Sequence, residues 1–242
     1  WLFEWLASIG GGGQVRAAGH RVVHGGERFA EPARIDAGIV AQLEKLVPMA
    51  PLHQPHDLAA IGALMKLRPE LPQVACFDTA FHRTVPPLAQ TFALPREITA
   101  AGVRRYGFHG LSYEYIAGVL PEHLGARAEG RIVVAHLGNG ASMCAMQARR
   151  SIATTMGMTA LDGLMMGTRS GAIDPGVLFY LMREYSLGAD EVEDMLYHRS
   201  GLLGVSGVSS DMRDLLASKD SRAREAVELF AYRAARELGS LA

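Results

Sequence analysis

Two clusters in the sequence carry side chains that could bind a small anion or take part in its reaction. In GHRVVHGGE, Arg21 lies at the end of an apolar, strand-like run and beside a glycine turn. A guanidinium in that position can offer a fork of donors to a carboxylate or a phosphate. The alternative is an ordinary surface salt bridge. In CFDTAFH, Asp78 and His82 follow the β-rich run QVACF, and α/β proteins place functional side chains where strands end. The alternative for Asp78 is a helix cap.

The remaining clusters combine an imidazole or an arginine with loops suited to phosphate. In RRYGFHG, His109 lies between Phe108 and Gly110 on a predicted loop, although a lone histidine is often only a structural hydrogen-bonding residue. HLGNGAS offers backbone N–H groups at a glycine turn, and MMGTRSG places Arg169 between glycines. SGVSSDMRD combines a glycine-rich turn with a predicted helix start, where N–H groups favour anions. Each signal is weak alone, and together they favour phosphoryl transfer.

Other chemistries lack their sequence signals. The chain contains no Walker loop, no zinc-type spacing of Cys and His, and no Gly-x-Ser-x-Gly elbow. Its 242 residues carry 24 Lys+Arg against 25 Asp+Glu, a net charge of −1 that disfavours binding to nucleic acid. No apolar run reaches the roughly 18 to 20 residues of a membrane helix, so no membrane association is expected. Cys76 and Cys144 lie in apolar runs and are predicted to be buried, reduced thiols.

Strands and helices are predicted to alternate, which indicates an α/β protein. Strands are expected through Val22 and Val23, in QVACF, and in a hairpin around Gly138-Asn139-Gly140, because Asn-Gly tolerates positive φ. The stretch from Met156 to Gly176 is expected to be mostly loop. Helices are predicted after caps at Asp36, Ser112 (ending at Pro121) and Asp174, in PHDLAAIGALMKL, from Asp190 to about Tyr197, in SSDMRDLL and from Arg222 to Leu238.

Seven motifs occur in an order that resembles the acetate kinase family, within the acetate and sugar kinase/Hsp70/actin superfamily. The resemblance runs from Gly19 to about Asp214, through GHRVVHGGE, PLHQPH, CFDTAFH, RRYGFHGLSYEY, AHLGNGAS, GLMMGTRSGAIDPG and SGLLGVSGVSSDMRD. It implies an α/β, actin-like ATPase (ribonuclease H-like) two-domain architecture, incomplete at both termini. Residues 1–128 would be the remainder of the N-terminal domain with the acyl-substrate site. Residues 129–242 would be part of the C-terminal domain, with the nucleotide-phosphate loops.

The resemblance also implies an activity: reversible, direct in-line transfer of the γ-phosphoryl group of ATP to acetate, giving acetyl phosphate and ADP. The alternatives are a propionate kinase of the same family and a catalytically dead fragment that still binds nucleotide. Because the chain begins with Trp1 and not Met, we expect it to be part of a longer protein. Mg²⁺ is the implied cofactor, with ligands mainly in the absent termini and none assigned within this sequence. A cytoplasmic homodimer is the implied form of the full-length protein.

Site residues follow from the matched motifs. The implied catalytic residues are Asp78, His109 on the transferring phosphoryl group, and Arg169 as the stabiliser of its transition state. The implied substrate-binding residues are Arg21 on the carboxylate, the active-site histidine His53, and an apolar pocket of Val23, Leu52 and Phe108. The implied nucleotide-binding residues are His136, Leu137, Gly138, Asn139 and Gly140 on the phosphates, with Asp211, Met212 and Arg213. Ala160 stands where the family usually has proline, which predicts a looser acyl pocket.

Overall fold

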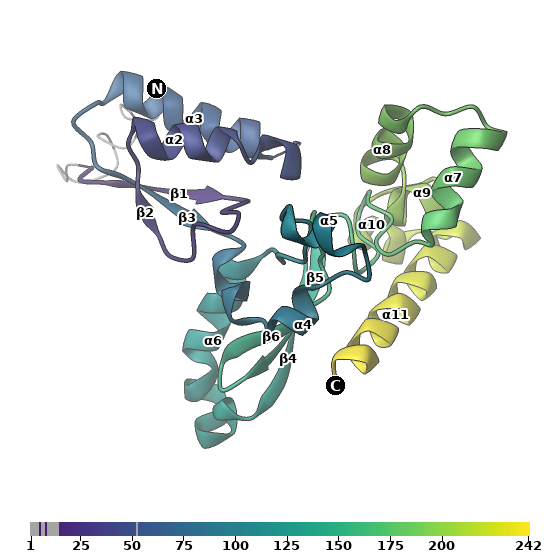
Figure 1. The fold of residues 1–242 in the computed structure, drawn as a ribbon. Helices are drawn as coiled ribbons and strands as arrows, with labels where there is room; N and C mark the ends of the chain where they lie inside the picture. Colours follow the sequence, from purple (N-terminus) through teal and green to yellow (C-terminus); the bar gives the residue numbers. More distant parts are fainter. Residues whose placement is uncertain (1–4, 6–7, 9–14, 52) are drawn as a thin grey trace. The chain divides into compact units, whose positions relative to one another are not determined.

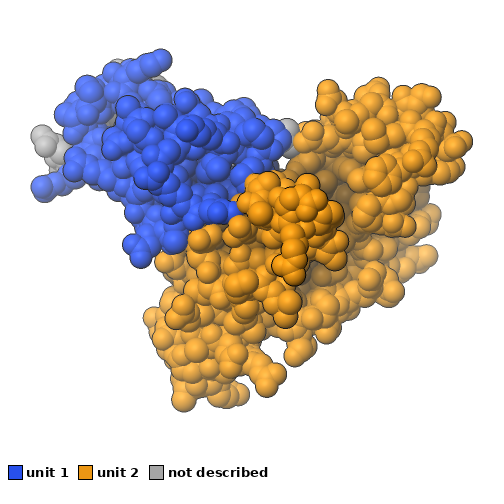
Figure 2. Space-filling model, viewed as in Figure 1, with its two compact units in different colours: residues 1–77 blue, residues 78–242 orange. Residues whose placement is uncertain are grey.

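The protein is described by a computed structural model that covers residues 5, 8, 15–51 and 53–242 (Figure 1). The chain forms two compact units, Trp1–Phe77 and Asp78–Ala242, which Figure 2 colours separately. This division falls directly after the run QVACF. The domain boundary expected near residue 128, in the Gly/Pro-rich loops between about Gly125 and Gly130, stays a prediction.

The first unit is built on a small mixed sheet. Strand β1 (Ala18–Val22) pairs in parallel with β3 (Gln73–Phe77), and the short β2 (Ala33–Arg34) pairs antiparallel with the other edge of β3. Arg21 lies opposite Cys76 in this register. Parallel strands need a crossover connection, and the segment between β1 and β3 supplies two helices for it. Both strands predicted here are confirmed.

Helices α2 (Ala37–Glu44) and α3 (Gln54–Leu67) cover this sheet, with the 3₁₀ turn η1 (Val47–Met49) between them. Figure 1 shows the two helices lying side by side along one face of the strands. The side chain of Asp36 accepts a hydrogen bond from Ile39 N–H at 2.8 Å, so the predicted cap is confirmed. Leu43 and Ile61 are fully buried, and Phe29 stacks on Phe77 with 4.9 Å between ring centroids.

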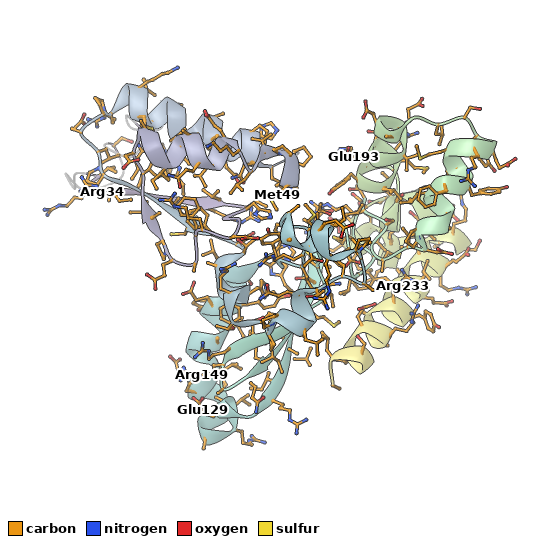
Figure 3. The ribbon with its side chains drawn as sticks, viewed as in Figure 1. Arg34, Met49, Glu129, Arg149, Glu193 and Arg233 are labelled. Carbon is orange, nitrogen blue, oxygen red and sulfur yellow. The ribbon has the colours of Figure 1, made fainter. Side chains whose placement is uncertain are left out.

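The second unit contains an antiparallel sheet in the order β4-β5-β6, formed by β4 (Arg131–Leu137), β5 (Ala141–Gln147) and β6 (Arg150–Thr154). The predicted hairpin at Gly138-Asn139-Gly140 joins β4 to β5. Strand β6 was not predicted from the sequence. It is reached through a tight turn at Ala148 and Arg149, both at positive φ. Arg149 forms an ion pair with Glu129 at 2.7 Å, and the two labelled side chains lie together in Figure 3.

Helix α6 (Gly110–Leu124) packs beside β4 and corrects the predicted helix bounds. The helix begins directly after His109, which has left-handed backbone with φ 60°, so Ser112 lies within the first turn and does not cap it. Pro121 lies inside the helix and does not end it. A proline so close to the C-terminus interrupts little of the helix, and the chain continues into the 3₁₀ turn η3 (Gly125–Glu129).

The remaining helices that the structure describes in the second unit come before α6 or follow the long Gly- and Met-rich loop between β6 and α7. They are η2 (Ala80–Thr84), α4 (Pro87–Gln90), α5 (Arg96–Ala100), α7 (Pro175–Glu184), α8 (Ala189–His198), α9 (Gly201–Ser206), α10 (Met212–Ala217) and α11 (Ser221–Leu241). Asp174 caps α7 as predicted, whereas α9 was not predicted. Helix α11 packs against α9 and α10 through a buried cluster that includes Leu202, Leu215 and Ala226.

Two further sequence predictions concern cysteines and membranes. Cys144 is buried and Cys76 is partly buried, and both are free thiols. Among the helices that the structure describes, none combines the length and apolar character needed to cross a lipid bilayer.

Candidate active site

Asp78 and His109 lie on segments that touch through their backbones. The N–H of Gly110 donates to the carbonyl oxygen of Asp78 at 2.8 Å. A Cβ atom on Gly110 would lie 2.1 Å from that same oxygen, so only glycine allows this approach. Asp78 and Phe108 are each 1% exposed. The start of α6 therefore places His109 next to the strand-end aspartate, two residues that the sequence predicted to act together.

His109 belongs to a cluster of side chains, the His109 cluster, formed with His136, Tyr113 and Ser142. Its Nδ1 lies 2.8 Å from Ser142 Oγ, which lies 2.6 Å from the hydroxyl of Tyr113. Its ring stacks on His136 with 4.1 Å between centroids and 20° between planes. His136 Nδ1 is in turn 3.0 Å from Ser112 Oγ. The stacking on His136 and the hydrogen bond to Ser142 together fix the orientation of the His109 imidazole.

Arg169 approaches the same place from the long loop. A Cβ atom built on Gly140 would lie 3.2 Å from His109 Nε2 and 3.7 Å from Arg169 Nη1. The two nitrogens are therefore no farther apart than the sum of these distances. Arg169 Nη1 also donates to the carbonyl of Ala160 at 3.0 Å, and its guanidinium lies 6.0 Å from the centre of the Tyr197 ring. Gly140, His109 and Arg169, which were predicted from separate motifs, thus meet, and the last two present side-chain nitrogen atoms there.

A cavity of about 540 Å³, the loop cavity, lies where the hairpin turn meets the start of α10. Its volume falls in the range of small-molecule sites. The residues that line it are Leu137, Gly138, Asn139, Gly167, Leu202, Ser210, Asp211, Met212, Arg213 and Phe230. The structure therefore brings most of the predicted nucleotide-binding residues into one cavity. His136 and Gly140 lie instead at the His109 cluster and beside Arg169.

Gly167 is a member of the loop cavity that the sequence did not single out. Its N–H donates to the carbonyl of Asn139 at 3.0 Å. A Cβ atom at Gly167 would lie 2.0 Å from the Asn139 side-chain oxygen. This glycine lets the Arg169 loop lie directly against the hairpin turn. Its position in MMGTRSG was the available signal.

The rim of the loop cavity carries an exposed ion pair. The side chain of Asp211 accepts from the backbone N–H of Arg213 at 2.8 Å, which caps α10. Hydrogen bonds from the guanidinium and the N–H of Arg213 lower the pKa of Asp211 to about 2, and the same pairing raises the pKa of Arg213. Both groups are therefore charged at neutral pH.

His82 is a buried histidine to which the sequence assigned no role. Its Nε2 lies 2.9 Å from the carbonyl oxygen of Phe108, and its Nδ1 lies 2.8 Å from Ser151 Oγ. Because the carbonyl only accepts, Nε2 carries the proton and Nδ1 accepts from Ser151. Burial lowers the pKa of His82 to about 4 and raises the pKa of the neighbouring Cys144 thiol to about 12. His82 is thus neutral, and its hydrogen bond holds the backbone carbonyl of Phe108 in place. Its position four residues after Asp78 was the sequence signal that could have identified this supporting residue.

The predicted substrate-binding residues divide between the two units. Val23 is 2% exposed in the first unit, where its N–H donates to Asp57 at 2.9 Å, and His53 directly precedes α3. Arg21 lies near the end of β1. Leu52 lies outside the described residues. Phe108 belongs to the second unit, so the apolar pocket of Val23, Leu52 and Phe108 stays a prediction.

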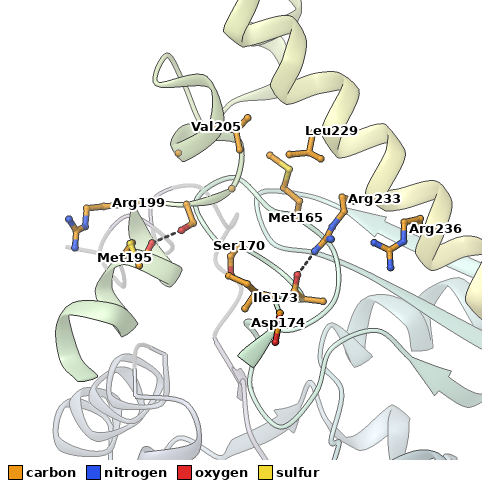
Figure 4. Close-up of a pocket in the computed structure, with 14 residues that line it drawn as sticks. Met165, Ser170, Ile173, Asp174, Met195, Arg199, Val205, Leu229, Arg233 and Arg236 are labelled. Carbon is orange, nitrogen blue, oxygen red and sulfur yellow. Dashed lines mark hydrogen bonds between the residues drawn. The ribbon is translucent and has the colours of Figure 1, made fainter. Parts of the chain in front are cut away.

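A second cavity, of about 660 Å³, lies between α8, α9 and α11 and was not predicted (Figure 4). Met165, Val205 and Leu229 supply part of its apolar wall. Arg233 donates to the carbonyl of Ala172 beside it, as the dashed line in Figure 4 shows. Among the residues that the structure describes, no group of three or more His, Cys, Asp or Glu side chains is arranged to hold a metal ion.

Comparison with known proteins gives the class of the fold and then the family. A crystal structure of an acetate kinase from Porphyromonas gingivalis matches with a TM-score of 0.85 and 43% identity, over 93% of this chain and 58% of that one. A propionate kinase from Francisella tularensis subsp. tularensis SCHU S4 matches with a TM-score of 0.94 and 40% identity, over 99% and 63%. The fold is the predicted α/β, actin-like ATPase fold.

The model of the acetokinase family matches residues 8–242, and the chain belongs to that family. It is 63% identical over 242 residues to an acetate kinase of Rhodopseudomonas palustris (strain ATCC BAA-98 / CGA009), covering all of this chain and 61% of that protein. It is 50% identical over 239 residues to an acetate kinase of Rhizobium meliloti, covering 99% and 60%. The chain therefore spans about three fifths of the length of these relatives.

Proposed function

We propose that the protein is an acetate kinase that transfers the γ-phosphoryl group of ATP reversibly to acetate. The observation that carries this proposal is the meeting of His109 Nε2 and Arg169 Nη1 beside Gly140, next to the loop cavity. Two nitrogen donors this close to the same point can both donate to one phosphoryl group, with hydrogen bonds of about 2.8 Å from each. The acetate kinases of Rhodopseudomonas palustris and Rhizobium meliloti support the choice of acetate.

The chemistry requires a carboxylate to attack a phosphoryl group that is itself negatively charged. Arg21 is proposed to hold the acetate carboxylate, which orients its oxygen for in-line attack. Arg169 and His109 are proposed to bind the equatorial oxygens as charge redistributes in the transition state. The carboxylate of Asp78, one residue after β3, is proposed as the third catalytic group. The direct transfer needs no covalent intermediate on the protein.

Nucleotide binding is proposed for the loop cavity. Backbone N–H groups of Gly138 to Gly140 and the start of α10 suit phosphate oxygens. Mg²⁺ would neutralise charge on the phosphates when bound with ATP. We propose that its ligands lie mainly outside this sequence. A cytoplasmic homodimer is proposed as the working form of the whole protein.

The direct test is to trap the product. Purified protein with ATP, Mg²⁺ and acetate should convert hydroxylamine to acetyl hydroxamate and release ADP in equal amounts. The reaction without acetate is the control, and it should release little ADP. Nucleotide binding without any hydroxamate would overturn the proposal and favour the reading as a nucleotide-binding protein without turnover.

Propionate kinase is the second candidate, favoured by the Francisella tularensis structure and by Ala160. The carbonyl of Ala160 accepts from Arg169, and proline keeps that carbonyl, so Ala160→Pro changes volume while preserving this hydrogen bond. One methylene is worth about 1 to 3 kcal/mol of discrimination. We expect Ala160→Pro to raise the ratio of kcat/KM for acetate over propionate. An unchanged ratio would remove Ala160 from a role in acyl selection.

A further inference from the structure

We infer that Ser142 and Tyr113 are positioning residues that hold His109 as the neutral tautomer with its proton on Nε2, directed toward the transferring phosphoryl group. The inference rests on the proposed function for its purpose, but the tautomer itself is a property of the protein without substrate. Neither residue was a candidate from the sequence. Their effect reaches the substrate only through His109.

The geometry supplies a chain of three polar groups. The hydroxyl of Tyr113 lies 2.6 Å from Ser142 Oγ, which lies 2.8 Å from His109 Nδ1. Tyr113 and Ser142 are both 0% exposed, so solvent does not compete for these bonds. Tyr113 lies on the first turn of α6 and Ser142 on β5, so the chain joins the helix to the sheet.

The direction of the protons follows from the buried phenol. Burial raises the pKa of Tyr113, so its hydroxyl keeps its proton. The backbone of His136 also bonds to Tyr113 and lowers this pKa, as an N–H that donates to the phenol oxygen does. The Tyr113 proton is then directed at Ser142 Oγ. The Ser142 proton is left for His109 Nδ1, which must accept it, because a buried hydroxyl proton without an acceptor is costly.

The stacking of the two imidazoles disfavours the state in which both rings are charged, and a neutral His109 satisfies this condition. With 4.1 Å between the His109 and His136 ring centroids, charges on both rings would repel strongly. A neutral His109 whose Nδ1 accepts from Ser142 carries its only N–H on Nε2. Nε2 is the atom that lies 3.2 Å from the position a Cβ atom would take on Gly140, and Arg169 Nη1 lies 3.7 Å from that same position. The hydrogen bonds from Tyr113 to Ser142 and from Ser142 to His109 therefore fix the His109 imidazole as a donor beside Arg169.

The test is nitrogen NMR on protein labelled with ¹⁵N-histidine, which distinguishes the two neutral tautomers and the imidazolium. We expect wild-type His109 to be the Nε2–H tautomer near neutral pH, and Ser142→Ala to give a mixture. The same variant should lose about 10- to 100-fold in kcat, the worth of one hydrogen bond to a charged group, with KM for ATP nearly unchanged. Tyr113→Phe should shift the tautomer in the same direction by less.

The matched control is Tyr115→Phe on the same helix, where the residue is 69% exposed and the tautomer should not change. An Nδ1–H tautomer or an imidazolium in the wild type, or an unchanged tautomer in Ser142→Ala, would overturn the inference. Failure of the proposed function has a different signature. In that case the Nε2–H tautomer would be present while no acetyl hydroxamate forms.

Discussion

The His109 cluster and the rim of the loop cavity handle charge in opposite ways. In the His109 cluster, buried neutral groups hold one imidazole through hydrogen bonds of 2.6 and 2.8 Å. At the rim, Asp211 and Arg213 form an ion pair that is exposed to solvent, with the Arg213 side chain 89% accessible. Exposed pairs are screened and contribute little, whereas buried hydrogen bonds fix direction. In the proposed function, the fixed orientation of the hydrogen-bonding groups therefore matters most beside the transferring phosphoryl group.

The largest effect is expected where Arg169 meets His109. Arg169→Ala removes the positive charge opposed to the phosphoryl group and should lower kcat by about 10³-fold or more. The thermal unfolding midpoint should change less than kcat, because Arg169 is only partly buried and donates to the Ala160 carbonyl within its own loop. Arg183→Ala, on α7, is the control. Steady-state kinetics with undiminished kcat for Arg169→Ala would remove the residue from its role.

The next effect tests how tightly the start of α6 must lie against Asp78. Gly110→Ala places a Cβ atom 2.1 Å from the Asp78 carbonyl oxygen, so the helix must move. We expect a loss of about 3 kcal/mol in the free energy of unfolding, with a large fall in kcat. Gly118→Ala on the same helix meets no atom within 4 Å and should stabilise by about 0.5 to 1 kcal/mol. Denaturant unfolding that shows equal effects for both variants would contradict this.

The third effect is a pH dependence of the free energy of unfolding, and it tests the contrast between buried neutral groups and exposed charged ones. The pKa of buried His82 is about 4 against an ordinary 6.5, so its neutral form stabilises the fold fully above pH 6.5 and this contribution disappears as pH falls toward 4. The difference corresponds to about 3 kcal/mol. His82→Gln should flatten that part of the stability profile between pH 7 and 4, measured by denaturant unfolding. The exposed His123→Gln serves as control, and a slope like that of the wild type in His82→Gln would contradict the prediction.

The smallest effect is expected at the rim. Asp211→Asn keeps an acceptor for the Arg213 N–H and so keeps the cap of α10, but it removes the charge. We expect KM for ATP to change by less than about fivefold and kcat to stay the same, with the change shrinking at higher salt. A large fall in kcat would mean that this ion pair acts on the reacting group, and the contrast between the two regions would fail.

Local signals in the sequence determined much of the framework. The caps at Asp36 and Asp174 and the hairpin at Asn139-Gly140 were predictable because each depends on residues a few positions apart. The bounds of α6 were not, because the left-handed backbone at His109 and the contact of Gly110 with Asp78 override the preference of Ser112 for a cap. Strand β6 likewise follows from pairing with β5.

The candidate site shows the same division between what local sequence signals predict and what only the tertiary structure determines. The motifs contained His109, Gly140 and Arg169 as separate candidates, and the family resemblance suggested their roles. Only the tertiary structure placed their atoms around one point and supplied Tyr113, Ser142 and His82 as supports. His109 and Ser142 are 33 positions apart, and His82 and Ser151 are 69 apart. Contacts over such separations leave no local pattern, because they form only when helix and sheet pack together and exclude water.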